Sequence, residues 1–272
     1  MEERIGAMTS WLGLPHLASQ HGADLDRALG WVHLLMLVLF VGWSAFFVYV
    51  LVRFRKKRNP TADYVGVTSK TSTWLEVAVA VAEAFLLIGL SIPLWADRVD
   101  RFPSPRESTV VRVVAEQFAW NIHYPGPDGV FGRTDVSLID TQSNPLGLDR
   151  ADPAAKDDVT TINLLHLPVG RPVLIQLSSK DVIHSFALQE MRVKQDAIPG
   201  TMIPVWFVPN VTTEEMRTRT GNPNFGYEIS CAQLCGLGHY RMRGYLTIHT
   251  PEAFQQWMDE QQAQLSEAGD FW

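Results

Sequence analysis

Two long apolar runs near the start of the chain constrain what it can fold into. Residues 31–52 contain no Asp, Glu, Lys or Arg. At about 1.5 Å of rise per residue, a helix over this run is long enough to cross a bilayer core about 30 Å thick. Residues 77–95 carry one charge, Glu83, and lie between Trp74 and Trp95, whose side chains suit the depth of a membrane interface. We therefore predict two membrane-spanning helices.

The charges around these runs predict how the helices are oriented. Only Arg4 and Arg27 precede the first run, whereas the segment between the runs carries six basic residues: Arg53, Arg55, Lys56, Lys57, Arg58 and Lys70. By the positive-inside rule this connecting loop, about residues 53–73, is cytoplasmic. A cleaved signal peptide fits poorly, because the first thirty residues are largely polar and the first apolar run is longer than the apolar core of a signal peptide. We expect an exterior segment over 1–30, the two helices with their loop over 31–97, and an exterior domain over 98–272.

The exterior part has the pattern of an all-β domain. Short runs rich in Val, Ile and Tyr alternate there with Gly, Pro, Asn and Asp. Such runs predict strands of a sandwich or barrel and not βαβ units. The runs are residues 110–114, 161–165, 173–177, 205–208, 227–229 and 245–248. Residues 251–265 then predict a terminal amphipathic helix.

Both cysteines of the chain lie in one short segment that also carries an imidazole and a thioether. Its pattern is Cys231-x3-Cys235-x3-His239-x2-Met242, and a further candidate imidazole, His184, lies between apolar neighbours 47 positions before Cys231. Thiolate and thioether ligands favour Cu(I), and imidazole binds both copper states, so the set indicates copper. A disulfide, a structural zinc site and chance clustering are competing interpretations. None of them requires both Met242 and His184.

The sequence as a whole resembles subunit II of the haem-copper cytochrome c oxidases. The resemblance rests on the two spans, the segment Gln117-Phe118-Ala119-Trp120, the stretches 181–186 and 194–200, and the cysteine loop. It implies a two-helix transmembrane hairpin plus an all-β cupredoxin-like sandwich with a C-terminal helix. It also implies two copper ions in a binuclear CuA centre. Cys231 and Cys235 would bridge both coppers, His184 and His239 would each bind one, Met242 would be a weak axial ligand, and Gln233 would bind through its main-chain carbonyl.

The resemblance further implies a place in a respiratory chain. The centre would take electrons from cytochrome c, or from another haem donor, and pass them to haem in subunit I, where oxygen is reduced and protons are pumped. The implied location is a bacterial inner membrane, with oxidase subunits and lipid as partners. We expect no nucleic-acid partner, no catalytic residue and no haem in this chain, because a c-type haem needs Cys-x-x-Cys-His and the two cysteines lack that spacing.

Several positions depart from the pattern of the family or match it only locally. Gln233 stands where many relatives have Glu, and a neutral amide is a weaker magnesium ligand than a carboxylate, so magnesium has little support. Asp196 matches a family position near a subunit boundary, with a simple turn cap as the alternative. Phe118 replaces the tryptophan through which electrons are thought to enter, and Trp120 matches the second aromatic, for which core packing is the favoured role.

Two glutamates in the second span differ in what they imply. Glu76 lies at its cytoplasmic end and matches a family glutamate near the mouth of a proton-uptake path, with an ordinary interfacial carboxylate as the alternative. Glu83 lies within the span, where many relatives have proline. Because ionisable groups inside a membrane are costly, we expect Glu83 to face a partner subunit.

The charge of the exterior domain and three other protein classes complete the prediction. From Asp97 onward the sequence holds 22 acidic and 15 basic residues, a balance that suits a basic partner and equally suits an acidic domain that is merely soluble. A copper chaperone of the Sco type also uses Cys-x3-Cys with a histidine, but would have one span and a thioredoxin-like pattern. A quinol oxidase subunit without copper would lack the two cysteines that this chain has. A blue copper protein needs one cysteine and not two.

Overall fold

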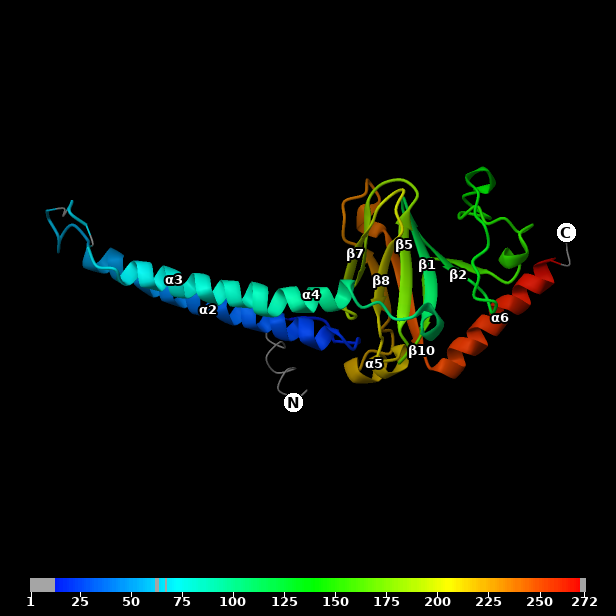
Figure 1. The fold of residues 1–272 in the computed structure, drawn as a ribbon, viewed down its shortest axis with the longest axis horizontal. Helices are drawn as coiled ribbons and strands as arrows, with labels where there is room; N and C mark the ends of the chain where they lie inside the picture. The colour runs from blue at the N-terminus through cyan, green and yellow to red at the C-terminus, as the bar shows by residue number, and fades with distance from the viewer. Residues whose placement is uncertain (1–12, 62–63, 67, 270–272) are drawn as a thin grey trace. The chain divides into compact units, whose positions relative to one another are not determined.

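The computed structural model describes residues 13–61, 64–66 and 68–269, and the chain divides into two compact units (Figure 1). Among the described residues, Ala23–Arg101 form a helical unit. The other unit is β-rich and consists of Pro15–Gly22 together with the chain from Phe102 onward. Residues 1–12 of the expected N-terminal segment, and 62–63 and 67 of the expected loop, lie outside the described residues.

The helical unit contains two helices that are long and apolar enough to cross a membrane. The first is α2 (Gly22–Arg53), and the second runs over Thr71–Val99. In each helix the most apolar stretch contains no residue that is buried inside the protein. The core helices of a soluble domain are mostly buried, so these two helices differ from them. The two predicted spans, 31–52 and 77–95, lie within these helices. α2 begins earlier than its apolar run, and Asp24 and Arg27 form an ion pair of 3.1 Å in its polar first turns.

The second helix changes its winding in the middle. It consists of α3 (Thr71–Ala84), a π-helical segment η2 (Phe85–Ser91) and α4 (Ile92–Val99). In the π segment the Ile92 amide donates to the carbonyl of Leu87, and the Ser91 hydroxyl donates to Leu86 O at 3.1 Å. Pro93 follows directly and has no amide to donate. A wider turn ahead of a proline is one way in which a helix continues past it.

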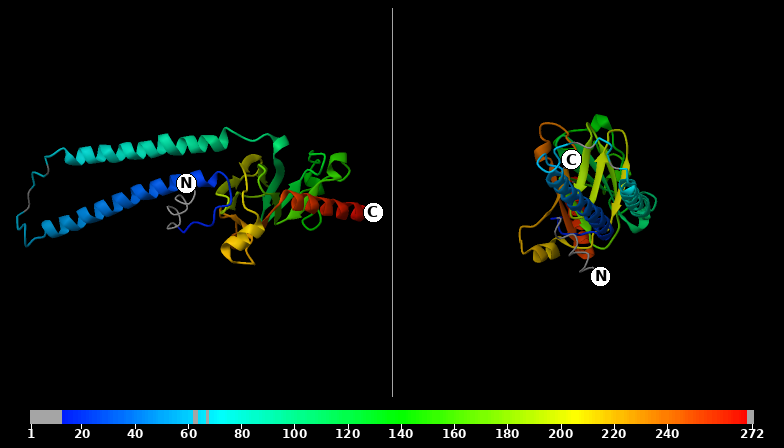
Figure 2. Two further views of the ribbon diagram at one scale, coloured as in Figure 1. Left: turned by 90° about the horizontal axis from the view of Figure 1, so that it is seen from below. Right: turned by 90° about the vertical axis from the view of Figure 1, so that its left-hand side faces the viewer.

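The β-rich unit is a sandwich of two five-stranded sheets (Figures 1 and 2). One sheet has the order β3-β2-β1-β5-β8, with bounds Val159–Ile162, Ala119–Tyr124, Thr109–Glu116, Val173–Ser179 and Ile203–Phe207. The other has the order β4-β10-β9-β6-β7, with bounds Leu164–Pro168, Arg243–His249, Tyr227–Cys231, His184–Leu188 and Val193–Ala197. The predicted β-sandwich is confirmed.

The core forms where the inner faces of the two sheets meet. Trp120, Ile175 and Leu177 of the first sheet are fully buried, as are Phe186 and Ile229 of the second. Side chains alternate across a strand, and β1 accordingly buries every second residue over much of its length. Burial of these apolar side chains is the main favourable contribution to the stability of the domain.

The strand prediction was wrong over residues 161–165, which are not one strand. β3 and β4 belong to different sheets, and Asn163 between them has a left-handed backbone with φ of 59°. Its side-chain oxygen accepts from Trp120 N at 2.8 Å, and its carbonyl accepts from Tyr245 N at 2.7 Å. An asparagine tolerates this conformation better than most residues, so the chain can cross from one sheet to the other here.

A long insertion, residues 125–158, connects β2 to β3. It contains the short helices η4 (Val136–Leu138) and η5 (Pro153–Ala155). Its end is held by a buried hydrogen bond, in which Asp158 Oδ2 lies 2.6 Å from His123 Nε2. Burial lowers the pKa of His123, although its hydrogen bond to Asp158 opposes that shift.

The predicted terminal helix is present as α6 (Pro251–Gly269), coloured red in Figures 1 and 2. Trp257 stacks on His166 of β4, with 4.2 Å between ring centroids and 4° between ring planes. His166 Nδ1 in turn lies 2.8 Å from Nε2 of His249. Burial, with a smaller contribution from His249, lowers the pKa of His166 to about 4. The imidazole pair is therefore packed beneath the helix in its neutral form.

The segment Pro15–Gly22 packs against the β-rich unit as part of it. Ala18 N donates to Glu190 O at 2.8 Å, and Asn210 N donates to Ala18 O at 3.0 Å. The Ser19 hydroxyl donates to Met191 O at 2.7 Å, and both Ala18 and Ser19 are buried. Three further helices complete the unit: η3 (Pro105–Glu107), α5 (Thr213–Thr220) and η6 (His239–Arg241).

Candidate metal centre

The cysteine loop connects two neighbouring strands of the second sheet. Cys231 ends β9, and Met242 directly precedes β10, so the loop closes where the antiparallel pair begins. Cys231 N donates to Met242 O at 3.3 Å across its base. His184 is the first residue of β6, which pairs with β9 in the register Phe186 to Cys231. The sheet therefore brings His184 to the loop although 47 positions separate it from Cys231.

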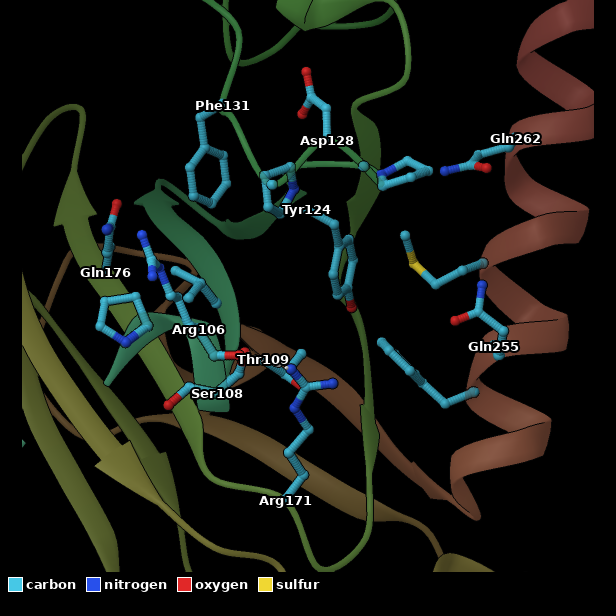
Figure 3. Close-up of a pocket in the computed structure, with 18 residues that line it drawn as sticks. Arg106, Ser108, Thr109, Tyr124, Asp128, Phe131, Arg171, Gln176, Gln255 and Gln262 are labelled. Carbon is cyan, nitrogen blue, oxygen red and sulfur yellow. Dashed lines mark hydrogen bonds between the residues drawn. The ribbon is translucent and has the colours of Figure 1, made fainter. Parts of the chain in front are cut away.

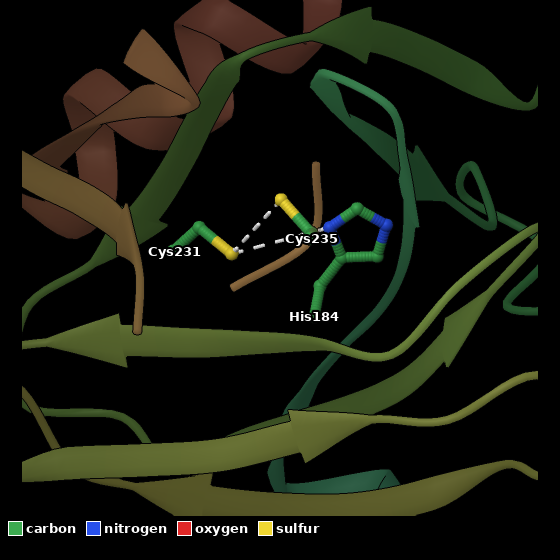
Figure 4. A group of neighbouring side chains, drawn as sticks. All are labelled: His184, Cys231 and Cys235. Atoms are coloured by element: carbon green, nitrogen blue, oxygen red, sulfur yellow. Dashed lines mark hydrogen bonds between the residues drawn. The ribbon is translucent and has the colours of Figure 1, made fainter. Parts of the chain in front are cut away.

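The potential metal-binding atoms of the loop and of His184 converge on one point (Figure 4). The ligand atoms of His184, Cys231 and Cys235 all lie within 4.8 Å of one another. The two sulfurs are 3.8 Å apart, and Cys231 Sγ is 3.9 Å from His184 Nδ1. Among the described residues, these three form the one group of at least three His, Cys, Asp or Glu side chains with this spacing.

The other three predicted ligands surround this group. Cys235 Sγ lies 3.7 Å from His239 Nδ1 and also 3.7 Å from Met242 Sδ. Met242 Sδ is 3.2 Å from His184 Nδ1, so these two lie on the same side of the thiol pair. The main-chain oxygen of Gln233 is 3.2 Å from Cys231 Sγ. All six atoms expected from the sequence therefore lie around one small volume.

The two thiols are free and are not joined in a disulfide. Burial, followed by the neighbouring Cys231, raises the pKa of Cys235 to about 11. At neutral pH Cys235 is thus protonated without a metal. A bound cation stabilises the thiolate and releases the proton, which couples metal binding to pH. Two soft sulfurs held beside two imidazoles and a thioether form a donor set that fits copper.

A hydrogen-bonded carboxylate holds His184 from the side away from the thiols. Asp181 Oδ1 lies 2.9 Å from His184 Nε2, and its Oδ2 accepts from Gln117 N at 2.7 Å. Burial opposes ionisation of Asp181, but its hydrogen bonds to His184, Gln117 and Val182 lower its pKa overall. Sequence reasoning gave Asp181 no role. The available signal was a carboxylate three positions before a candidate ligand histidine.

Gln117 links this carboxylate to the cysteine loop. Its side-chain amide donates to Cys235 O at 2.6 Å, while its backbone amide contacts Asp181. The next residue, Phe118, is half-buried and packs on the loop at Gly236 and Gly238. A Cβ added at Gly238 would lie 2.6 Å from Phe118 Cγ, which is too close for a real contact. Glycine is therefore required there for the loop to approach the aromatic ring.

Trp120 is fully buried in the core, in agreement with the packing role favoured from the sequence. Its ring meets His184 edge to face, with 6.2 Å between centroids, and meets Phe186 at 5.5 Å. It therefore supports the imidazole from within the sandwich.

Two of the predicted residues lie outside the cluster. Asp196 is exposed on β7 and pairs in register with Ser185, one position from His184. Glu76 is exposed on α3, in the helical unit. At the loop itself, three apolar side chains face outward: Leu234, Leu237 and Tyr240 are 79%, 97% and 81% exposed.

A second concave site, of about 770 Å³, lies between α6, the insertion and strands β1, β2 and β5 of the first sheet (Figure 3). Arg106, Arg171, Asp128, Tyr124 and Phe131 are among its lining residues. Arg171 donates to the main-chain oxygens of Glu107 and Ser108, both at 3.3 Å. None of the six predicted metal ligands lines this cleft.

Comparisons with known proteins agree with the sequence resemblance. The family model described as cytochrome C oxidase subunit II, periplasmic domain, matches residues 109–247. The chain is 34% identical over 224 residues to the alternative cytochrome c oxidase subunit 2 of Bradyrhizobium diazoefficiens, covering 82% of this chain and 75% of that protein. It is 27% identical over 275 residues to cytochrome c oxidase subunit 2 of Synechocystis sp., covering 93% and 79%.

A solved structure also resembles the chain. The periplasmic domain of subunit II of cytochrome oxidase from Bradyrhizobium japonicum matches with a TM-score of 0.41 and 24% sequence identity, over 61% of this chain and 99% of that one.

Proposed function

Because this chain belongs to the cytochrome c oxidase subunit II family, we propose that its metal centre is a binuclear CuA site that carries single electrons. As subunit II of a haem-copper oxidase, the chain works in a complex with other oxidase subunits. The observation that carries the proposal is the convergence of six donor atoms, two of them free thiols 3.8 Å apart. We propose His184, Cys231, Gln233, Cys235, His239 and Met242 as the ligands.

The number and pairing of the donors favour two coppers over one metal ion. A structural zinc site takes four ligands in a tetrahedron, and six donors exceed that number. The two thiolates would be shared between two ions. His184 and Met242, which lie together, would serve one of them, and His239 and the Gln233 carbonyl would be left for the other. Each copper would then have four donors.

When copper is bound, the centre supplies reversible one-electron chemistry shared between two ions. The protein's part is to keep the ligands in place. Asp181 fixes the His184 ring, Gln117 holds the Cys235 carbonyl, and Trp120 packs against the imidazole. A ligand set restrained from three sides rearranges little when the charge changes, which permits fast transfer at small driving force.

We propose that cytochrome c, or another haem protein, delivers the electron at the exposed end of the cysteine loop. Leu237 and Tyr240 extend into solvent there, and Phe118 packs beneath the same loop. The excess of acidic residues from Asp97 onward would steer a basic donor toward the domain. The electron would then pass to haem in subunit I, the proposed site of oxygen reduction and of coupled proton pumping.

The proposed location is the inner membrane of a bacterium, with lipid around the two helices and the copper domain on the exterior side. The basic residues of the loop between the helices support this orientation. Glu76 then lies near the cytoplasmic surface, where we propose that it contributes to a proton entrance. Asp196 remains a predicted contributor to the subunit boundary. A magnesium ion is not part of the proposal, because Gln233 offers no carboxylate.

The test is copper content together with electron paramagnetic resonance of the full chain in detergent after copper reconstitution. We expect two coppers per chain that share one unpaired electron. Cys231→Ser and Cys235→Ser should each abolish that signal, whereas Met242→Leu should shift the potential and keep both coppers. A single weakly bound copper would contradict the CuA proposal and favour a chaperone. No copper, with a Cys231–Cys235 disulfide, would favour a copper-free relative.

A further inference from the structure

Glu83 is an exposed carboxylate within the second membrane-spanning helix. It lies on α3, two residues before the π-helical segment. Within the described part of the chain, no ion pair or hydrogen bond involves its side chain. It is also the one charged residue in the predicted span 77–95. The described part of this subunit therefore offers the Glu83 carboxylate no hydrogen-bonding partner.

The position of Glu83 along the helix places it too deep to reach water. Val77, which begins the apolar run, is six residues earlier, or about 9 Å at 1.5 Å per residue. A glutamate side chain is shorter than that distance. An ionisable group at such depth is costly, and in membrane proteins it faces protein or a water-filled cavity and not lipid.

The helix geometry defines which face carries this carboxylate. At 3.6 residues per turn, Glu76 and Glu83 lie on the same side, with Ala80 between them. We call these three residues the Glu83 face; all three are exposed. Val81 points to the opposite side of the helix. The small Ala80 side chain allows another helix to approach closely.

The first helix of this subunit does not cover the Glu83 face. A groove of about 580 Å³ between the two helices is lined on the second helix by Ala82, Phe85, Leu86, Gly89 and Leu90. The side chains of Ala82 and Leu86 are partly covered, whereas Glu83 remains exposed. A partner from outside this chain is needed to satisfy the carboxylate.

We propose that the Glu83 face binds a membrane-spanning helix of another oxidase subunit, and that this helix presents a hydrogen-bond donor at the depth of Glu83. Charge complementarity sets the chemistry of the partner: a basic, hydroxyl or amide side chain pairs with a carboxylate. The pair fixes the register between the two subunits, because sliding either helix by one turn would leave both groups unpaired in the membrane. This inference goes beyond the copper site and does not depend on it.

The test measures how firmly this subunit is held in the purified oxidase complex in detergent. Leucine inserts into membranes better than glutamate, so Glu83→Leu should not impair insertion. We expect Glu83→Leu to dissociate about tenfold faster or more, because the partner's donor is left unpaired. Glu83→Gln retains a hydrogen-bonding group and should dissociate more slowly than Glu83→Leu. Val81→Leu, on the opposite side, should behave as the unmodified complex.

Unchanged or slower dissociation of Glu83→Leu would overturn the proposal, because that outcome is expected for a residue that faces lipid. A photoreactive residue placed at Ala80 gives an independent readout. We expect crosslinks from Ala80 to another subunit, and adducts with lipid alone would also overturn the proposal. The copper spectrum should remain unchanged in every variant, so failure here is distinguishable from failure of the CuA assignment.

Discussion

Asp181 accepts a hydrogen bond from His184, with 2.9 Å between the carboxylate Oδ1 and the imidazole Nε2. This contact requires the proton on Nε2 and leaves Nδ1 free to face the thiols, 3.9 Å from Cys231 Sγ. The carboxylate also accepts from the Gln117 backbone, whose side chain holds the carbonyl of Cys235. One hydrogen-bonded chain therefore connects a strand, a turn and the cysteine loop around the metal centre.

Removal of the carboxylate should weaken copper binding. Partners that orient a ligand histidine typically contribute about 10–100-fold to metal affinity. We expect Asp181→Ala to lose affinity in that range and Asp181→Asn, which keeps an acceptor oxygen, to lose less. Chelator competition measures the affinity, and Asp196→Asn, at an exposed position on β7, is the matched control. Equal affinity in Asp181→Ala and the unmodified protein would refute the orienting role.

A methyl group at Gly238 should disturb the cysteine loop by colliding with Phe118. The Cβ of alanine would lie 2.6 Å from Phe118 Cγ, so the loop or the ring must move. Overpacking of this kind typically costs about 1–3 kcal/mol. We expect Gly238→Ala to lower the free energy of unfolding and to alter the copper spectrum. The double variant Gly238→Ala with Phe118→Ala should recover the copper spectrum. If the double variant instead loses as much stability as the two single variants added together, the collision is contradicted.

Loss of the buried Asp158 carboxylate should loosen the insertion. Its Oδ2 contacts His123 and also accepts from Gly132 N at 2.8 Å. Removing the acceptor of two buried hydrogen bonds leaves both donors without partners and costs about 1–3 kcal/mol. We expect Asp158→Ala to unfold at lower denaturant concentration and to be cleaved faster by protease within residues 125–158. Asp157→Ala, the neighbouring and less buried carboxylate, should have a small effect.

The domain should lose stability in acid through His166. Its folded pKa of about 4 lies below the ordinary value of 6.5 because burial disfavours the charged form. The unfolded chain therefore binds the proton first as pH falls. The stabilisation is complete above pH 6.5 and is lost as pH falls towards 4, by up to about 3 kcal/mol.

Denaturation midpoints measured at both ends of this pH range test the assignment to His166. His166→Gln cannot take up a proton at this position and should show a smaller loss of stability in acid. His16→Gln, at an exposed position, should retain the full loss. An acid sensitivity that is identical in the unmodified protein and in His166→Gln would assign it to other groups.

The sequence predicted which sulfur and imidazole side chains lie together more completely than it predicted the strands that carry them. Sulfur and imidazole are rare enough that the loop and His184 could be grouped without knowing the fold. β6 and β7 were not predicted, because Ser185, Lys194 and Asp196 interrupt their apolar pattern. Those strands nevertheless bring His184 to the loop. Propensity is a weak guide where a strand is buried on both faces or is held by its neighbours.

Contacts between distant polar residues were beyond the sequence. The interactions of Asp181 with Gln117, and of Gln117 with Cys235, join positions 64 and 118 apart. No local pattern encodes such pairs, because they arise only when the sheets close. The helices were easier to predict, since an apolar run long enough to span a membrane has few alternative structures.

The hydrogen bonds that fix Pro15–Gly22 to the β-rich unit have a consequence for biosynthesis. This segment is translated before both helices, yet its partners at Glu190, Val208 and Asn210 are translated long after them. The domain cannot be completed until this segment meets those partners, so Pro15–Gly22 must lack these hydrogen bonds while the rest of the chain is made. A segment that is synthesised before both helices is therefore among the last parts of the domain to reach its folded contacts.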